Sequence, residues 1–196
     1  LACNSILKKN NLVHITGCGS VPGIGNVMLK YAKDKFDKIN DIEVGFAWDS
    51  NIKEFVVPFS IESITKEFIN PAEIVINHKT VMINPGDTVF NCVLRGVGQE
   101  KCFNVGHHPE TFTFYEYCKD KGIKNVKFYA GFPNHSYEKI KMLVDLGFAS
   151  QDPIRIDHKK VIPLIFLTNV LKKLKIPKGY KEVENLWVDL NGTYQN

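Results

Sequence analysis

A chain of 196 residues with 44% hydrophobic and 23% charged residues has the composition of a globular protein that can bury a substantial core. Its net charge of +4 comes mostly from lysine, and Arg95 and Arg155 are the two arginines. This balance argues against a nucleic-acid partner, because base readout relies on clustered arginine. The five cysteines show no CxxC spacing, so neither a disulfide framework nor a zinc site is expected.

The chain is expected to be cytoplasmic and to have no membrane partner. No apolar run is long enough to span a bilayer, and the N-terminus lacks the residue order of a signal peptide. The densest basic run, residues 172–181, is interpreted as a solvated helix end, with a binding patch as the alternative. The first residue is not Met, and residues 184–196 are predicted to form a strand with no partner after it. We therefore expect a piece of a longer protein.

Residues 13–36 are predicted to form a short strand, a glycine-rich turn and a helix. Ser20 is expected to cap the helix and Pro22 to lie in its first turn. The helix carries one apolar face, made of Ile24, Val27, Met28, Tyr31 and Ala32.

The other elements follow from periodicity and turn residues. They are a strand over 42–49, a helix over 60–69 that Ser60 caps, a hairpin over 73–87, and a strand pair over 88–106. A helix opened by Pro109 and closed by Gly122 follows, then a strand over 125–132, a helix over 134–147, and a helix over 160–175. Strands that occur in adjacent pairs as well as between helices favour an α+β fold with a mixed, largely antiparallel sheet covered by helices.

The glycines at 17, 19 and 23 raise the possibility of a phosphate site. A glycine-rich turn before a helix offers free N–H groups and the positive end of the helix dipole. The spacing is close to a dinucleotide fingerprint, and Asp49 could hold a ribose, although it lies about thirty residues on and not about twenty. The polar hairpin over 73–87 stands where that fold requires a crossover helix and a parallel strand. A self-contained dinucleotide-binding domain is therefore only an alternative.

Several motifs resemble those of saccharopine dehydrogenase-like proteins. Residues 17–26, centred on VPGI, resemble the family's G-x-x-PGI-x-N turn, which lies just beyond its nucleotide-binding domain. Residues 59–72 are similar to its W-S-P-E-G followed by N-P-A, and the hairpin containing Lys79 is similar to its nGK hairpin. Residues 106–110 resemble its H-P-E segment, and residues 126–147 resemble its final strand and L-x-x-L-G helix. The resemblance spans roughly residues 12 to 172.

The resemblance implies that residues 1–196 form one substrate-binding and dimerisation domain of a two-domain oxidoreductase. Such a domain closes over a nicotinamide and an amino acid or its imine or secondary-amine derivative, and it forms a homodimer. NAD or NADP would be held mainly by a separate N-terminal domain, so this chain alone would be inactive. Phe59 and Ile61 replace the family's Trp and Pro, and Val21 replaces an acidic residue. These departures leave the substrate open and keep a non-catalytic binding or regulatory module as the alternative.

Oxidation beside a nicotinamide requires a group that carries a proton. His108, followed by Pro109 and Glu110 at a loop-to-helix junction, is the candidate catalytic residue, because histidine titrates near neutral pH. A surface or capping histidine is the alternative. A metal site is not expected, because His107 and His108 with Cys102 or Cys118 lack a recognisable ligand spacing.

The candidate ligand contacts fall in two groups. Ser60, Glu62 and Glu110 are the candidate substrate contacts, although Ser60 and Glu62 could equally serve to start their helix. The candidate cofactor contacts, for which a tight turn without a ligand is the alternative, are Gly17, Pro22, Gly23 and Asn26.

Overall fold

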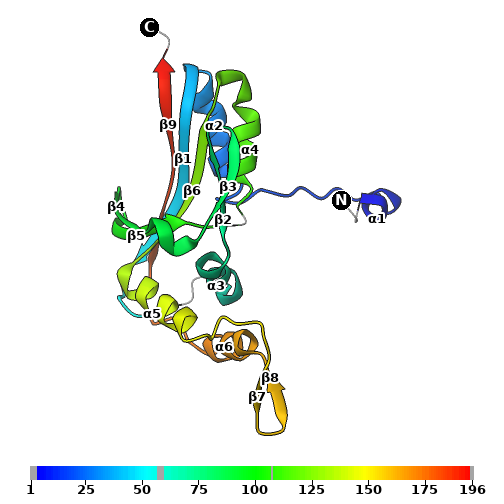
Figure 1. The fold of residues 1–196 in the computed structure, drawn as a ribbon, viewed down its shortest axis with the longest axis vertical. Helices are drawn as coiled ribbons and strands as arrows, with labels where there is room; N and C mark the ends of the chain where they lie inside the picture. Colours follow the sequence, from blue (N-terminus) through cyan, green and yellow to red (C-terminus); the bar gives the residue numbers. More distant parts are fainter. Residues whose placement is uncertain (1–3, 57–59, 107, 195–196) are drawn as a thin grey trace.

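The structure, a computed structural model, describes residues 4–56, 60–106 and 108–194. Phe59 and His107, which the sequence motifs include, lie outside the described residues. The helices are α1 Asn4–Lys9, α2 Ile24–Lys33, α3 Ile61–Ile69, α4 Glu110–Tyr117, α5 Asn134–Asp145 and α6 Pro163–Leu171 (Figure 1). The strands are β1 Phe36–Ser50, β2 Ala72–Ile76, β3 Lys79–Ile83, β4 Phe90–Leu94, β5 Gly98–Asn104, β6 Asn125–Phe132, β7 Ile154–Ile156, β8 Lys159–Val161 and β9 Glu182–Tyr194.

A mixed seven-stranded sheet forms the centre of the molecule. Its main order is β3-β2-β6-β1-β9, and the β4–β5 hairpin joins through β5 to β6. The β1–β6 pair is parallel, whereas the other pairs in the sheet are antiparallel. Helices flank the sheet (Figure 1). The predicted α+β fold with a mixed, largely antiparallel sheet is therefore confirmed.

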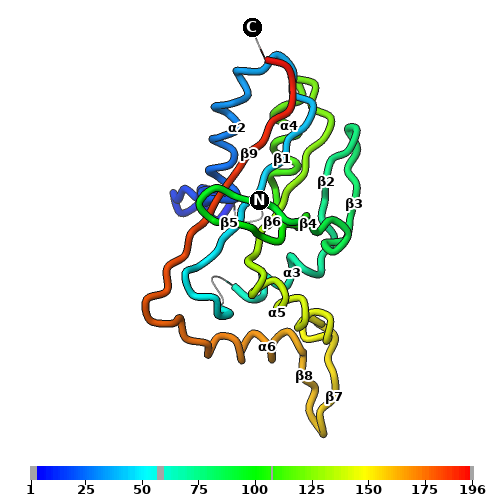
Figure 2. The backbone as a smooth tube through the Cα atoms, turned by 90° about the vertical axis from the view of Figure 1, so that its left-hand side faces the viewer, coloured from blue at the N-terminus to red at the C-terminus, as the bar shows by residue number. Residues whose placement is uncertain are grey.

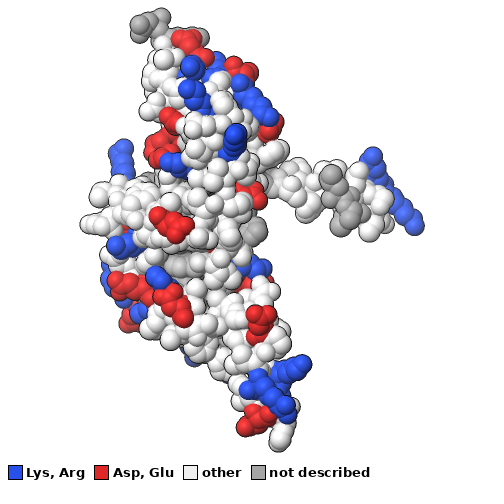
Figure 3. Space-filling model, in the orientation of Figure 1, with Lys and Arg blue, Asp and Glu red and all other residues white. Residues whose placement is uncertain are grey.

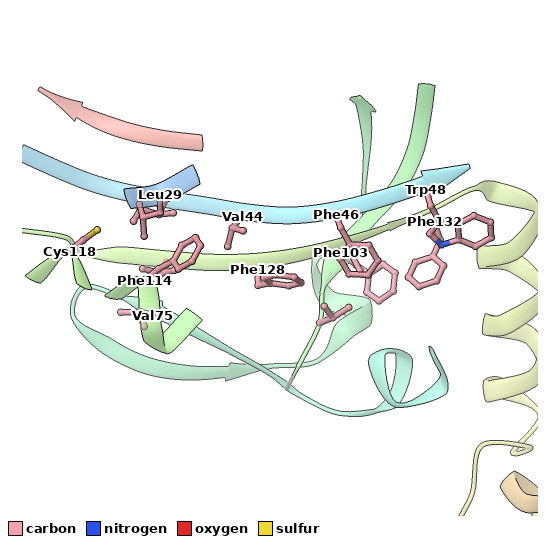
Figure 4. Close-up of a cluster of buried hydrophobic side chains, with 14 of the residues drawn as sticks. Leu29, Val44, Phe46, Trp48, Val75, Phe103, Phe114, Cys118, Phe128 and Phe132 are labelled. Carbon is pink, nitrogen blue, oxygen red and sulfur yellow. The ribbon is translucent and has the colours of Figure 1, made fainter. Parts of the chain in front are cut away.

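The hydrophobic core lies on one face of the β1–β6 pair. Alternate residues of a strand point to the same face, so Val44, Phe46 and Trp48 of β1 lie beside Phe128 of β6. Figure 4 shows these side chains together with Leu29 of α2, which packs onto them. This aromatic layer supports the helices that carry the candidate site.

The sheet curls so that the β4–β5 hairpin reaches β9 across β6 and β1. The side-chain amide of Asn185 on β9 donates to the Arg95 carbonyl at the hairpin tip, at 2.9 Å, and Figure 2 shows the two segments close together. The curl requires small residues beneath it. A Cβ at Gly131 would lie 3.0 Å from Cys102 Sγ and would overlap the Cβ of Ala47. Gly131 therefore permits the close approach of β1, β6 and β5.

The N-terminal part differs from the sequence prediction. Residues 12–18 form no strand but an exposed arm that leads away from the sheet to α1 (Figure 1). Helix α2 begins after Gly23, which takes the capping position predicted for Ser20, and Pro22 precedes the helix. Its predicted apolar face is largely exposed, as Val27 shows, because α2 packs through the other side. That side carries the buried residues Gly25 and Leu29, which face the core.

The C-terminal part also departs from the prediction. Residues 184–196 were predicted to be a strand that runs into a turn, but β9 continues as a strand to Tyr194 and pairs with β1, an earlier strand. The β7–β8 hairpin was not predicted, and it shortens the last predicted helix to α6.

Predictions based on local signals are confirmed: Ser60 caps α3, and β6 has the predicted bounds. None of the helices in the described ranges is long and apolar enough to cross a membrane.

Replacement of Gly131 by Ala should destabilise the fold, because the added methyl group must displace Ala47 or Cys102 under the curled hairpin. We expect a loss of roughly 1 to 3 kcal/mol in the free energy of unfolding, measured by urea denaturation. Gly86→Ala is the matched control, since a Cβ at Gly86 meets nothing within 4 Å. Equal stability of the Gly131 variant and the wild type would contradict the close packing.

Candidate functional site

A cavity beside α3 is lined by His108 and Glu67, and Glu110 lies next to His108. The cavity has a volume of about 470 Å³ and is lined by Ser63, Lys66, Glu67, Asn70, Gly106 and His108. Within the described part of the chain, no hydrogen-bond partner is present for His108 Nδ1, Glu67 Oε2 or either carboxylate oxygen of Glu110. Buried polar groups are normally paired, so this concentration of unpaired atoms makes the region the candidate site.

His108 is held in place by the aromatic core. Its ring stacks on Phe128, with 3.8 Å between ring centroids and 11° between the planes. The side chain is 14% exposed, and its Nδ1 lies 3.7 Å from Glu110 Oε2, too far for a hydrogen bond. The imidazole is therefore oriented by packing, and its Nδ1 remains available to a ligand.

Glu110 is the first residue of α4, directly after Pro109. Its side chain is fully buried. The N-terminal end of a helix carries the positive end of the dipole, which stabilises a negative charge placed there. The structure thus brings together His108 and Glu110, one candidate catalytic and one candidate substrate-binding residue.

Glu67, on α3, is a site residue that the sequence reasoning missed. Burial raises the pKa of its carboxyl to about 8. The adjacent Lys66 gives Glu67 no compensating charge, because its Nζ binds Glu62 Oε1 at 2.8 Å. The available sequence signal was a carboxylate next to the apolar stripe formed by Ile64 and Phe68. An apolar stripe in the sequence does not show whether the polar residues beside it are buried in the fold.

The polar atoms at this cavity are acceptors or proton carriers. Ionised carboxylates only accept hydrogen bonds, and an ammonium group offers three donors and a positive charge. An amine is therefore the ligand chemistry that Glu67 and Glu110 complement, because a cation bound beside Glu67 would lower its raised pKa and favour the ionised carboxylate. The His108 imidazole is the group that could carry a proton beside such a ligand.

Ser60 and Glu62 lie at a different place. Ser60 Oγ accepts a hydrogen bond from the Ser63 amide at 3.4 Å, and the ion pair with Lys66 lowers the pKa of Glu62. Both residues line a separate hollow of about 350 Å³, which Lys172 and other residues of the α6 region also line. The structure therefore does not bring them together with His108.

In the turn predicted to face the cofactor, residues 17–26, the backbone amide groups donate hydrogen bonds to carbonyl groups of the same turn. The Gly19 amide donates to the Pro22 carbonyl at 2.8 Å, and the Ile24 amide donates to the Gly19 carbonyl at 2.9 Å. Gly23 has a φ of 142°, and a Cβ there would overlap the Gly19 carbonyl oxygen. The amides of residues 25–27 are likewise bonded within the turn, so the first turn of α2 leaves no free N–H group for a phosphate.

The same turn is linked to the candidate site through α4. The Asn26 side-chain amide donates to Thr113 Oγ1 at 3.3 Å, one helical turn from Glu110. Gly17 and Pro22 lie in the turn on the other side of Gly23, and their contact with a cofactor remains a prediction. No strand precedes the turn in the described residues, so the strand–turn–helix unit of a dinucleotide fold is not formed there.

A second polar cluster links β1 to α5. Asp49 Oδ1 lies 3.5 Å from His135 Nε2, and His135 Nδ1 lies 3.1 Å from Ser136 Oγ. Ser136 is fully buried, and its hydroxyl is engaged with His135 inside the cluster. Burial alone would raise the pKa of Asp49, but hydrogen bonds from Lys53 and the Ser50 amide lower it. We interpret this cluster as structural, and the described residues contain no group of three or more His, Cys, Asp or Glu that could hold a metal.

The stability of the chain should fall as the pH rises from about 5 to about 8. Burial raises the pKa of Glu67 to about 8 in the folded state, whereas in the unfolded chain the group has its ordinary pKa of 4.5. Raising the pH between these values therefore favours unfolding, by up to about 1.4 kcal/mol per pH unit. The free energy of unfolding, measured by urea denaturation at several pH values, should fall less steeply with pH for Glu67→Gln than for the wild type. Equal slopes would contradict the burial of Glu67, and the exposed Glu62→Gln is the control.

Comparison with known proteins identifies the fold and not a close relative. No family model matches the chain, and no curated protein sequence matches it. Among solved structures, the apo histidine-tagged saccharopine dehydrogenase (L-Glu forming) of Saccharomyces cerevisiae aligns with 68% of this chain at 14% identity and a TM-score of 0.56. The homospermidine synthase of Legionella pneumophila, solved in complex with NAD, aligns with 98% of this chain at 14% identity and a TM-score of 0.46.

The chain spans 32% of the saccharopine dehydrogenase and 43% of the homospermidine synthase. Similarity at this level of identity shows the fold alone. The resemblance predicted from the sequence motifs is thus confirmed at the level of the fold: the chain shares the fold of part of saccharopine dehydrogenase.

Proposed function

We propose that the chain is the substrate-binding and dimerisation domain of a saccharopine dehydrogenase-like oxidoreductase. Its substrate would be an amino acid or its imine or secondary-amine derivative, and its cofactor would be NAD or NADP. The fold shared with saccharopine dehydrogenase supports the class of protein. In this proposal the nucleotide is held mainly by a domain absent from this chain, and two copies of the chain form a homodimer.

The observation that supports the proposal is the set of unpaired acceptors in and beside the cavity. A buried carboxylate without a partner costs the fold stability, roughly 1 to 3 kcal/mol for each unsatisfied group and more when it is charged. Glu67 and Glu110 both carry such oxygen atoms, and they lie on two different helices. Residues retained at that cost are best explained by a ligand that supplies the missing donors.

Each residue has a defined role in this proposal. Glu67 and Glu110 bind the amine nitrogen of the substrate, and His108 holds the proton that leaves or joins that nitrogen. When the nicotinamide is bound, it supplies hydride transfer to or from the adjacent carbon. The turn over residues 17–26 packs against the nicotinamide through its surface, since its amides are engaged. Ser60 and Glu62 lie outside the proposed amine site.

A binding or regulatory module on the same fold is the second candidate. Phe59 and Ile61, which replace the Trp and Pro of the resembled motif, favour it. Such a module would keep the amine site and lose turnover. The two candidates therefore differ in catalysis and not in binding.

Binding of an amine substrate should depend on the two buried carboxylates. Lysine should bind the chain measurably in calorimetry, and norleucine, which lacks the side-chain amine, should bind more weakly. Glu67→Gln and Glu110→Gln should each weaken lysine binding roughly tenfold or more, because each removes a charge-assisted hydrogen bond. Glu62→Gln should leave the affinity unchanged. Equal affinities for lysine and norleucine would contradict the proposed amine site.

Turnover should depend on His108 in a protein that also contains the nucleotide-binding domain. His108→Gln should lower kcat by roughly a hundredfold or more, measured through NADH or NADPH absorbance, because it removes the group that carries the proton. His78→Gln, which changes an exposed histidine, is the control. Wild-type protein that binds the substrate but shows no nucleotide-linked turnover would favour the regulatory module.

A further inference from the structure

Residues 151–181, called the basic end below, carry a net positive charge that exceeds the net charge of the whole chain. They contain eight Lys and Arg residues and two Asp residues, a net charge of +6, whereas the whole chain carries +4. The remaining residues are therefore net negative. The basic end comprises the β7–β8 hairpin, α6 and the loop to β9, and the hairpin and α6 form the extremity of the molecule opposite the C-terminus (Figure 1). Figure 3 shows a group of Lys and Arg side chains over this hairpin.

Helix α6 is apolar on two sides. Leu164 and Leu167 are buried, whereas Ile165, Phe166 and Val170 point outward, and Phe166 is 53% exposed. A helix that is hydrophobic all round is normally covered on all sides. Leu174, which follows the helix among the lysines, is exposed as well. The outer face of α6 is therefore an apolar surface bordered by positive charge.

The β7–β8 hairpin adds the same two features. Ile154 and Ile156 lie on one face, two residues apart, and both are half exposed. Arg155 stands directly opposite Lys160 on the paired strand, and like charges in this arrangement repel. A separate two-stranded hairpin is only marginally stable in water. A negatively charged surface with an apolar interior would relieve the repulsion and cover the isoleucines.

We propose that the basic end docks this chain on an anionic lipid bilayer, with the outer face of α6 and the isoleucines of β7 in the lipid interface. Docking of this kind needs no spanning helix, because apolar side chains and lysine attraction to anionic headgroups act together. This proposal adopts the alternative interpretation of residues 172–181 as a binding patch and replaces the expectation that the chain has no membrane partner. It goes beyond the proposed oxidoreductase function.

The residue types favour a lipid surface over a protein partner. Seven of the eight cationic residues in the basic end are lysines. Protein–protein interfaces are enriched in Arg, Tyr and Trp and depleted in Lys, which has no fixed hydrogen-bonding geometry. A diffuse layer of lipid headgroups requires only positive charge near its surface, and a fluid interface needs no complementary shape.

Vesicle co-sedimentation of the whole 196-residue chain tests this proposal. The chain should bind vesicles made of equal parts phosphatidylglycerol and phosphatidylcholine, and it should bind pure phosphatidylcholine at least roughly tenfold more weakly. Raising the salt concentration from about 0.1 M to about 1 M should release it, because the Debye length shortens. Two double variants, Lys173→Glu with Lys178→Glu and Ile165→Ser with Phe166→Ser, should each weaken binding roughly tenfold or more.

Matched controls lie in the N-terminal arm, which is equally exposed. Lys8→Glu with Lys9→Glu repeats the charge change, and Val13→Ser with Ile15→Ser repeats the apolar change. Both control variants should bind as the wild type does, and circular dichroism should show that every variant is folded. Absence of binding to anionic vesicles, or equal losses in the control variants, would overturn the proposal. A wild-type dimer that Phe166→Ser dissociates, without vesicle binding, would assign this face to a second copy and also overturn it.

Discussion

The parallel pairing of β1 with β6 is the constraint on which the rest of the structure depends. It places Phe46 and Phe128 on one face, where they form the aromatic layer that supports α2, α3 and α4. It places Ala47 and Gly131 on the other face, where their small size lets the β4–β5 hairpin curl over the sheet. The chain leaves β5 toward α4, and His108 comes to rest on Phe128 along this path. The core and the candidate site therefore share one support.

The site is built from groups whose burial the fold does not compensate. His108, Glu67 and Glu110 come from two helices and a loop, yet they share the property of having polar atoms without partners among the described residues. A fold optimised for stability alone would replace these side chains with apolar ones of similar size. A bound ammonium group would donate hydrogen bonds to the unpaired carboxylate oxygens. The destabilising burial of these groups is therefore explained if they bind a ligand.

Local signals in the sequence predicted the elements that depend on nearby residues. Ser60 capped α3 as expected, and the β6 strand kept its predicted bounds, because caps and short-range alternation determine such features. The pairing of β9 with β1 joins segments far apart in the chain, so no local sequence pattern could predict it. The buried side of α2 was predicted wrongly because it is set by packing of Leu29 into a core that includes Phe114, a residue far along the sequence. Glu67 escaped notice for the same reason: its burial depends on distant packing. His108 and Glu110 were predicted from one short motif and lie close together in the structure, whereas Ser60 and Glu62 line another hollow.

The most direct test of the unpaired acceptors is a crystal structure of the chain with lysine bound. The account predicts an amine nitrogen of lysine within about 3 Å of a carboxylate oxygen of Glu67 or Glu110, with His108 in contact with the same ligand. Lysine bound elsewhere, with ordered water molecules satisfying both carboxylates in the cavity, would contradict the account.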